Sequence, residues 1–285
     1  MSKHLYGDHD DTSMAGENPP VQEMSRRARI EADIPDGFDP HKPRLGRRES
    51  EPHSAEVTYL YDVLRSNFPQ DRVTWDLHHY FIVEGEEIDV VFDVSLFKGM
   101  SLPVQLSSYR AAEFGGRVPD LAINVMSKST WRSDVGEHVD LCHMLKIPVY
   151  VIYAPFHVAS RPYKPPFLRA YVADERGEYQ ARELRDVALK SGKEVNWDAT
   201  IDCGGHLPFK LGLQELEGAK HEKGWQLYRL VIINPRERTI FRSKLEMEHA
   251  RADQEKARAD KEKARADQEK ARADRAEEEL ARLRK

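Results

Sequence analysis

The chain has 285 residues, of which 40% are hydrophobic and 33% are charged, and this length allows one domain with a hydrophobic core plus appended segments. Its two cysteines, Cys142 and Cys203, provide neither a disulfide framework nor the spacing of a zinc site, so a reducing cytoplasm is the expected location. No apolar run approaches the about 20 residues of a membrane span and the N-terminus lacks a signal-peptide core, so we expect a soluble, intracellular protein without a membrane partner.

The charge balance disfavours general attraction to nucleic acid. The chain carries 44 Lys and Arg residues against 49 Asp and Glu residues. Residues 244–285 hold 13 and 12 of these, which leaves 31 against 37, a net charge of −6, for residues 1–243. Any nucleic-acid binding therefore requires a local basic patch or a metal ion.

The N-terminal segment, residues 1–50, is polar and contains Asn-Pro-Pro and Asp-Pro-His-Lys-Pro clusters without sustained periodicity. This composition predicts a disordered segment. A basic cluster within it could contact nucleic acid, but the acidic residues interspersed with it favour a solvated tail. The cluster comprises Arg26, Arg27, Arg29, Arg47 and Arg48.

The first periodic segment runs from residue 54 to residue 68. Its apolar residues lie at i, i+3, i+4, i+7 and i+11, which predicts an amphipathic helix with Ser54 as its N-cap. An alternating run over residues 73–83 then predicts a half-buried strand. Two adjacent residues of this strand, His78 and His79, point to its opposite faces, so packing is favoured over metal binding for both.

A second strand is predicted by the run EEIDVVFDV, which follows the turn at Gly85. Asp89 and Asp93 lie four residues apart on it, and the alternation of a strand places them on one face. Residues 95–117 have no clear period and predict an irregular connection. Three of their basic residues could meet a phosphate there, namely Lys98, Arg110 and Arg117.

Residues 118–154 have the pattern of a strand, a helix and a strand. Asp134 and Glu137 stand three apart, which is a capping-box spacing and predicts a helix starting near Asp134 and continuing to residue 146. In that helix His138 lies on the stripe that faces the sheet, over the strand of Asn124. The β-branched run 147–153 completes a unit of two neighbouring parallel strands with a covering helix.

The remaining chain predicts two short strands around a Glu-Arg-Gly turn, a further segment at HLPFKLGLQEL and a hairpin over residues 225–241. Residues 244–285 then repeat the heptad ARADQEK with small variations. Opposite charges recur at i+4, as in Lys256 with Asp260 and Arg258 with Glu262, and support a long helix. Its apolar residues are alanines without a/d spacing, so a single charged helix and a weak, self-associating coiled coil are both open.

The string PDLAINVMSKST, followed by Asp134, His138 and IPVYVIYAP, resembles a bacterial restriction-endonuclease family of the PD-(D/E)XK nuclease superfamily. The resemblance covers roughly residues 53–243. It implies an α/β fold with a restriction-endonuclease-like core, in which a central mixed sheet is flanked by helices. The expected organisation is therefore a disordered segment 1–50, a nuclease-like domain 51–243 and a charged heptad-repeat helix 244–285.

The same resemblance implies a degenerate catalytic site. Asp89 matches the family's acid on the earlier strand, while Asn124 stands at the position of a Glu and His138 at the position of a Lys. Members of the superfamily hold a divalent cation between acids on neighbouring strands, so Asp89 and Asn124 are the expected Mg²⁺ ligands, with weak binding because an amide carries no charge. Asp120 belongs to the motif, but four strand residues place it ~13 Å from Asn124.

His138 can be neutral at pH 7 and could act as a general base. The superfamily's usual lysine position holds Met126, and Lys128 is near in sequence. Two functions follow from these departures. One is a metal-dependent endonuclease that hydrolyses DNA phosphodiester bonds with a weakened site, and the other is an inactive nuclease-fold protein that serves as a binding or assembly module.

Overall fold

The computed structural model describes residues 50–100, 105–158, 161–190 and 193–283, which belong to one compact unit. The predicted disordered segment lies outside these residues except for Ser50. The α-helices are α2 (Glu51–Asn67), α3 (Trp131–Val135), α4 (Glu137–Met144) and α5 (Lys244–Leu283). Short 3₁₀ helices are η2 (Ala111–Phe114), η3 (Arg161–Tyr163) and η4 (Trp197–Ala199).

The larger sheet has seven strands in the order β3-β1-β2-β4-β5-β6-β7. These strands are β1 (Arg72–Val83), β2 (Glu86–Phe97), β3 (Tyr109–Arg110), β4 (Leu121–Val125), β5 (Val149–Ala154), β6 (Phe167–Ala173) and β7 (Tyr179–Leu184). Strands β4 and β5 are parallel, as are β1 and β3, and the other neighbours are antiparallel. The predicted mixed central sheet with flanking helices is confirmed.

A second sheet has four strands in the order β11-β10-β9-β8. They are β8 (Thr200–Asp202), β9 (Lys210–Lys220), β10 (Gln226–Asn234) and β11 (Thr239–Ile240). The hairpin predicted over residues 225–241 is confirmed as the antiparallel pair β10 and β11. The short strand β8 was not predicted, because a three-residue strand carries too few positions to show a period.

Two apolar layers cover the two faces of the larger sheet. On one face, α2 and the smaller sheet pack on β4, β5 and β6 through side chains such as Leu60, Leu121 and Leu230. On the other face, α4 and its neighbours pack through Cys142, Ile147 and the aromatic side chains around β1 and β2. Because burial of apolar area is the main favourable term in folding, these two layers fix the positions of the polar side chains that lie between them.

Two predicted helix starts are wrong. Helix α2 begins at Glu51, since Ser50 occupies the N-cap position with extended backbone and a proline follows in the first turn, so Ser54 lies inside the helix. The helix predicted from Asp134 to residue 146 is instead divided into α3 and α4 at Gly136, whose φ of −126° and ψ of −95° are not helical. No side chain caps α4, and Asp134 is buried instead.

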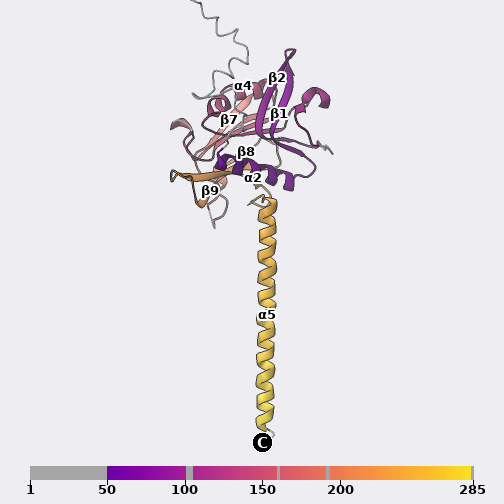
Figure 1. Ribbon diagram of the computed structural model, residues 1–285, viewed down its shortest axis with the longest axis vertical. Coiled ribbons are helices and arrows are strands. Elements are labelled where there is room, and N and C mark those ends of the chain that lie inside the picture. The colour runs from indigo at the N-terminus through magenta and orange to yellow at the C-terminus, as the bar shows by residue number, and fades with distance from the viewer. Residues whose placement is uncertain (1–49, 101–104, 159–160, 191–192, 284–285) are drawn as a thin grey trace, which may run out of the picture. The chain divides into compact units, whose positions relative to one another are not determined.

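The predicted long C-terminal helix is confirmed as α5, which runs unbroken from Lys244 to Leu283 (Figure 1). It starts with a capping box, in which the Ser243 N–H donates to Glu246 and the Glu246 N–H donates to the Ser243 hydroxyl. The Lys244 N–H donates to Asp62 of α2. None of the helices within the described ranges is long and apolar enough to span a bilayer.

Candidate functional site

Strands β2 and β4 separate at a fork, and polar side chains hold the fork together. The ladder between these strands includes the pair Val94 and Ile123 and does not continue to the next pair. There the Asp93 N–H donates to Asn124 Oδ1 at 3.3 Å, and the Val125 N–H donates to Asp93 Oδ2 at 2.6 Å. Side chains thus satisfy backbone groups that the sheet leaves unpaired where its strands diverge.

The position of Asp93 at the fork follows from a reversal of faces within β1 and β2. Val73 of β1 and Val94 of β2 pack on the α2 side, whereas Leu77 of β1 and Phe92 of β2 pack on the α4 side. Simple alternation along each strand would keep Val73 with Leu77, and Val94 with Phe92, on one face. Asp76 lies at the reversal with a φ of 45°, in the left-handed region that non-glycine residues seldom adopt. Asp89 and Asp93 both alternate with Val90 and Phe92, which pack on the α4 side, and Asp93 meets His53 of α2, so the expectation that the two carboxylates share one face is confirmed.

Asn124 is the centre of the polar cluster at the fork. It is 3% exposed, and its Nδ2 lies 2.9 Å from Asp134 Oδ1, 2.9 Å from His138 Nδ1 and 3.3 Å from the Tyr150 hydroxyl. Its Oδ1 accepts from the backbone of Asp93. The opposite amide orientation would turn the NH₂ group toward that N–H and an oxygen toward a carboxylate, so Asn124 donates to Asp134.

This amide orientation also assigns the tautomer of His138. Because Asn124 Nδ2 is a donor, the facing Nδ1 of a neutral His138 ring accepts and Nε2 carries the proton. The His138 side chain is 23% exposed, so it is more accessible to water than Asn124 or Asp134. His138 therefore has one ring nitrogen, Nδ1, bound in the cluster.

Asp134 is buried at the end of α3 and accepts from two elements. One carboxylate oxygen binds Asn124, and Oδ2 accepts from the Thr130 hydroxyl at 3.0 Å. The Tyr150 hydroxyl donates to the backbone oxygen of Asp134 at 2.9 Å. Burial and the neighbouring carboxylate raise the pKa of Tyr150 well above its ordinary value, so the phenol stays protonated as a donor.

Helix α2 contributes His53, which the sequence reasoning missed. Its Nε2 lies 3.3 Å from Asp93 Oδ2, and the residue is 5% exposed. A signal was present, because His53 precedes Val57 by four residues and so continues the apolar stripe of that helix by one turn. Asp134 was interpreted as a helix cap and as part of the resemblance but not as a site residue, although its spacing of four from His138 places both side chains on one side.

The predicted pairing of Asp89 with Asn124 is not formed. Asp89 Oδ1 lies 3.0 Å from His78 Nδ1, and both side chains are largely exposed. The register places Asp93 next to Asn124, and Asp89 lies four residues further along β2, ~13 Å away. His78 is accordingly an exposed partner of Asp89, whereas His79 is buried and packs among aromatic rings as predicted.

Asp120 lies at the other end of β4 from Asn124. Its Oδ2 accepts from the Lys98 N–H at 2.8 Å and is 3.8 Å from the Arg117 guanidinium, so it joins the start of β4 to the end of β2. The two remaining lysine candidates do not enter the cluster either. Met126 is fully buried in the apolar layer, and Lys128 is exposed.

The basic residues proposed to meet a phosphate all have protein partners. Lys98 Nζ donates to the His206 carbonyl at 2.6 Å, and Arg110 forms an ion pair with Glu87 at 2.7 Å. Arg117 binds the Lys98 carbonyl and lies near Asp120. None of the three faces Asn124, so the fork gains no cation from them.

The residues at the fork do not fit a Mg²⁺ ion as they are arranged. Mg²⁺ requires oxygen ligands in near-octahedral geometry. Asp93 Oδ2 already accepts from Val125 and lies beside His53, both Asp134 oxygens accept from protein donors, and Asn124 presents its nitrogen to the interior. Within the described part of the chain, no group of three or more His, Cys, Asp or Glu side chains is arranged to hold a metal.

Comparisons with known proteins add little to this geometry. No protein-family model and no curated protein matches the chain. One solved structure with partial similarity is described as "a putative nuclease belonging to DUF820" from Anabaena variabilis ATCC 29413, with a TM-score of 0.37, 15% sequence identity and coverage of 50% of this chain and 71% of that chain. A likeness of this size leaves the site to be judged on its own contacts.

Proposed function

We propose that this chain is a nuclease-like binding or assembly module that does not hydrolyse DNA. The observation that carries the proposal is the direction of the Asn124 amide, whose nitrogen donates to Asp134 and meets His138. A hydrolytic metal centre needs acceptor oxygens facing its ion, and here a donor occupies that direction. The cluster then serves to fasten β2, β4, β5 and the helices to one another.

The hydrogen-bonding balance of the cluster supports this role. Asp93, Asn124 and Asp134 each have protein partners, and Asn124 and Asp134 are almost fully buried. A buried polar network whose members are all satisfied rigidifies a fold, whereas a site for a missing ion leaves acceptors unpaired. We place the module in the cytoplasm, in agreement with its two buried free cysteines.

A metal-dependent DNA endonuclease is the second candidate, and the register favours it. Asp93 of β2 lies beside position 124 of β4, so an acid and an amide occupy neighbouring strands where the resemblance implies an acid pair. His138 is the candidate general base of the cluster, because its side chain is partly exposed. In this candidate Asn124 must turn its amide before its oxygen could face a Mg²⁺ ion, and binding would be weak.

Plasmid cleavage in Mg²⁺ or Mn²⁺ separates the two candidates. The wild type is expected to show no metal-dependent cleavage above a metal-free control. Asn124→Glu with His138→Lys restores a carboxylate and a permanent cation, and any activity gained should vanish on adding Asp93→Ala. Asp89→Ala is the matched control, because it removes an exposed carboxylate from the same strand.

Three results would change the assignment. Wild-type cleavage that is abolished by Asp93→Ala and survives Asp89→Ala would establish the endonuclease at the fork. Cleavage lost on Asp89→Ala alone would place the active site at the surface position. Failure of the folded double variant to cleave DNA would favour the binding or assembly module, because two substitutions would then not be enough to restore a catalytic site at the fork.

Self-association through α5 is the form of assembly that the sequence repeat supports. Ion pairs between Arg and Glu recur every seven residues along the helix, at Arg251, Arg258 and Arg265 with Glu255, Glu262 and Glu269. Alanines alternate with these charges, and their small side chains allow close helix approach. Sedimentation of the full chain tests the idea, because a constant monomer mass at all concentrations would assign α5 as a single helix.

A further inference from the structure

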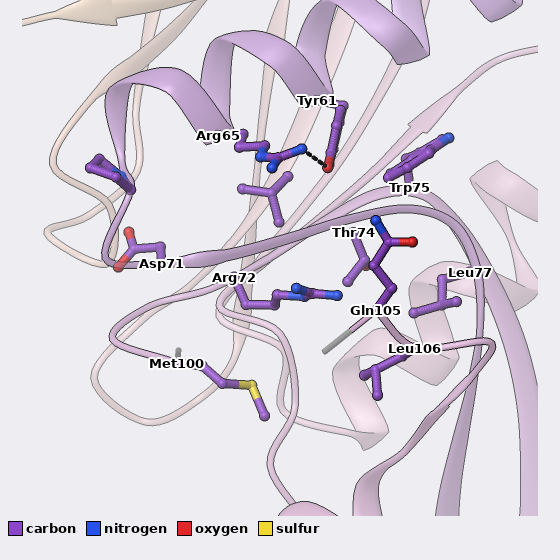
Figure 2. Close-up of a pocket in the computed structure, with 12 residues that line it drawn as sticks. Tyr61, Arg65, Asp71, Arg72, Thr74, Trp75, Leu77, Met100, Gln105 and Leu106 are labelled. Atoms are coloured by element: carbon purple, nitrogen blue, oxygen red, sulfur yellow. Dashed lines mark hydrogen bonds between the residues drawn. The ribbon is translucent and has the colours of Figure 1, made fainter. Parts of the chain in front are cut away.

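A pocket of about 380 Å³ lies between α2, the first residues of β1 and the side chains of Met100, Gln105 and Leu106 (Figure 2). Its size falls in the range of small-molecule sites. Two arginines, Arg65 and Arg72, and one carboxylate, Asp71, contribute to its lining. None of the fork residues contributes to it, so the pocket is a separate site.

Arg72 is the unusual residue of this pocket. Its Nε is buried and has no hydrogen-bond partner, and no ion pair is formed by its guanidinium among the residues that the structure describes. Figure 2 shows the side chain extended along the pocket toward Gln105. A guanidinium is charged at all ordinary pH values, and burial of its Nε–H without a partner is unfavourable. Arg72 as a whole is half-buried and lines the pocket, so a ligand can reach the rest of the group. The pocket therefore lacks an acceptor, and an anionic ligand would supply it.

The opposite wall strengthens the positive character of the pocket. Arg65 of α2 donates to the Tyr61 hydroxyl at 2.9 Å and is otherwise exposed. The one carboxylate, Asp71, accepts from the Gly99 N–H at 2.8 Å. Two guanidinium groups against one carboxylate give a local excess of positive charge in a chain whose residues 1–243 carry a net charge of −6.

Trp75 provides a flat apolar surface at the pocket's edge. It is 51% exposed, and its ring lies 4.2 Å from that of Tyr61 between centroids at an angle of 47°. A large exposed tryptophan is uncommon on a protein surface, and aromatic rings of this kind stack on nucleobases. An unpaired arginine beside an exposed tryptophan matches a ligand that has both a phosphate and an aromatic base.

We propose that this pocket binds a free nucleotide, with its phosphate on Arg72 and its base on Trp75. A volume of about 380 Å³ suits one nucleotide. The net negative charge of residues 1–243 disfavours a long polyanion, whereas a small anion needs only the local excess of positive charge. The inference goes beyond the proposed function and does not depend on Asn124 or His138.

Calorimetric titration of the full chain with AMP, GMP, CMP and UMP tests the proposal. At least one nucleotide should bind, and its nucleoside and inorganic phosphate should each bind at least about tenfold more weakly. Arg72→Gln should weaken binding by about 10- to 100-fold, since it removes a hydrogen bond to a charged group. Trp75→Leu should weaken it by about tenfold through loss of stacking.

Matched controls are Arg176→Gln, an exposed arginine of the β6–β7 turn, and Trp197→Leu, which lines a different pocket. Both should leave nucleotide affinity unchanged, and circular dichroism should show all variants folded. Undetectable binding of all four nucleotides, or full affinity in Arg72→Gln, would overturn the proposal. Phosphate binding as tight as nucleotide binding, or tight oligothymidylate binding that the nucleotides do not displace, would also overturn it.

Discussion

Two groups of polar side chains flank the β1–β2 hairpin, and they differ in how their hydrogen bonds are met. At the fork, Asp93, Asn124 and Asp134 are bound by protein donors and acceptors. In β1, Arg72 Nε at the pocket and His79 Nδ1 further along the strand are buried without a partner. The resemblance to nucleases directs attention to the fork, whereas the unmet donor points to the pocket, since buried polar groups without partners require an explanation.

The largest expected effect is at the fork. Asn124→Asp replaces a donor by an acceptor that faces Asp134 and puts two like charges in a buried site. The free energy of unfolding should therefore fall by about 3 kcal/mol. Urea denaturation with and without Mg²⁺ measures the change. If the fork can hold an ion, Mg²⁺ should restore stability to the variant in proportion to its binding.

Asn196→Asp is the matched control for this change. Asn196 is exposed and its Oδ1 accepts from the Asp198 N–H, a role that a carboxylate performs equally well. The free energy of unfolding of the Asn196→Asp protein should stay within about 0.5 kcal/mol of that of the wild type. An Asn124→Asp variant as stable as this control would show that the amide does not donate to Asp134.

The second effect concerns His79, the other buried residue of β1 with an unpartnered ring nitrogen. Burial lowers its pKa from 6.5 to about 4, so the folded state disfavours the charged ring. As the pH falls below 6.5 the unfolded chain gains a proton that the folded chain does not, and stability should fall by up to about 3 kcal/mol by pH 4. His79→Phe should remove this component.

Stability measured against pH for the wild type and His79→Phe isolates that contribution. Phenylalanine suits the site because Phe92 and Tyr109 surround the ring, and Ser95 keeps its bond of 2.7 Å to Thr74. Glu56 opposes the trend, since burial raises its pKa and acid then favours the folded state. Identical pH slopes for the two proteins would show that His79 is not held neutral by the fold.

A smaller effect of opposite sign is expected at Arg72. In the absence of ligand, Arg72→Met should raise the free energy of unfolding by about 1 kcal/mol, because it removes a buried unpaired donor and keeps an apolar stem. Binding residues often reduce stability in this way. Arg65→Met, at an exposed arginine, is the control, and a less stable Arg72→Met would contradict the unpaired state of Arg72.

The smallest effects are expected where charges are paired at the surface. Each Arg–Glu pair of α5 contributes about 0.3 to 0.5 kcal/mol to helix formation, and salt screens it. A peptide of residues 244–285 should therefore lose helicity as the salt concentration rises, and Arg251→Gln with Arg258→Gln should reduce this dependence. A random-coil spectrum at low salt would show that the repeat does not sustain a helix.

Local periodicity predicted most of the elements. Helix α2, strands β1 and β2, the parallel pair β4 and β5 and helix α5 follow from apolar spacing, because a buried face imposes its period on neighbouring residues. The same reasoning failed at Gly136, where one residue leaves the helical region and divides the expected helix. It also failed at Asp76, where a left-handed residue reverses the faces of two strands.

Sequence alone placed Asn124 and His138 on neighbouring elements, since both lie within one strand-helix-strand unit of about forty residues and their spacing is local. Only the tertiary structure decided that Asp93 and not Asp89 stands beside Asn124, and that His53 and Asp134 complete the cluster. The physical reason is that strand register depends on which distant side chains are buried together, so a shift of four residues moves a carboxylate by ~13 Å. The unpaired Arg72 is likewise a property of the packed molecule, because a missing partner has no signature in the chain itself.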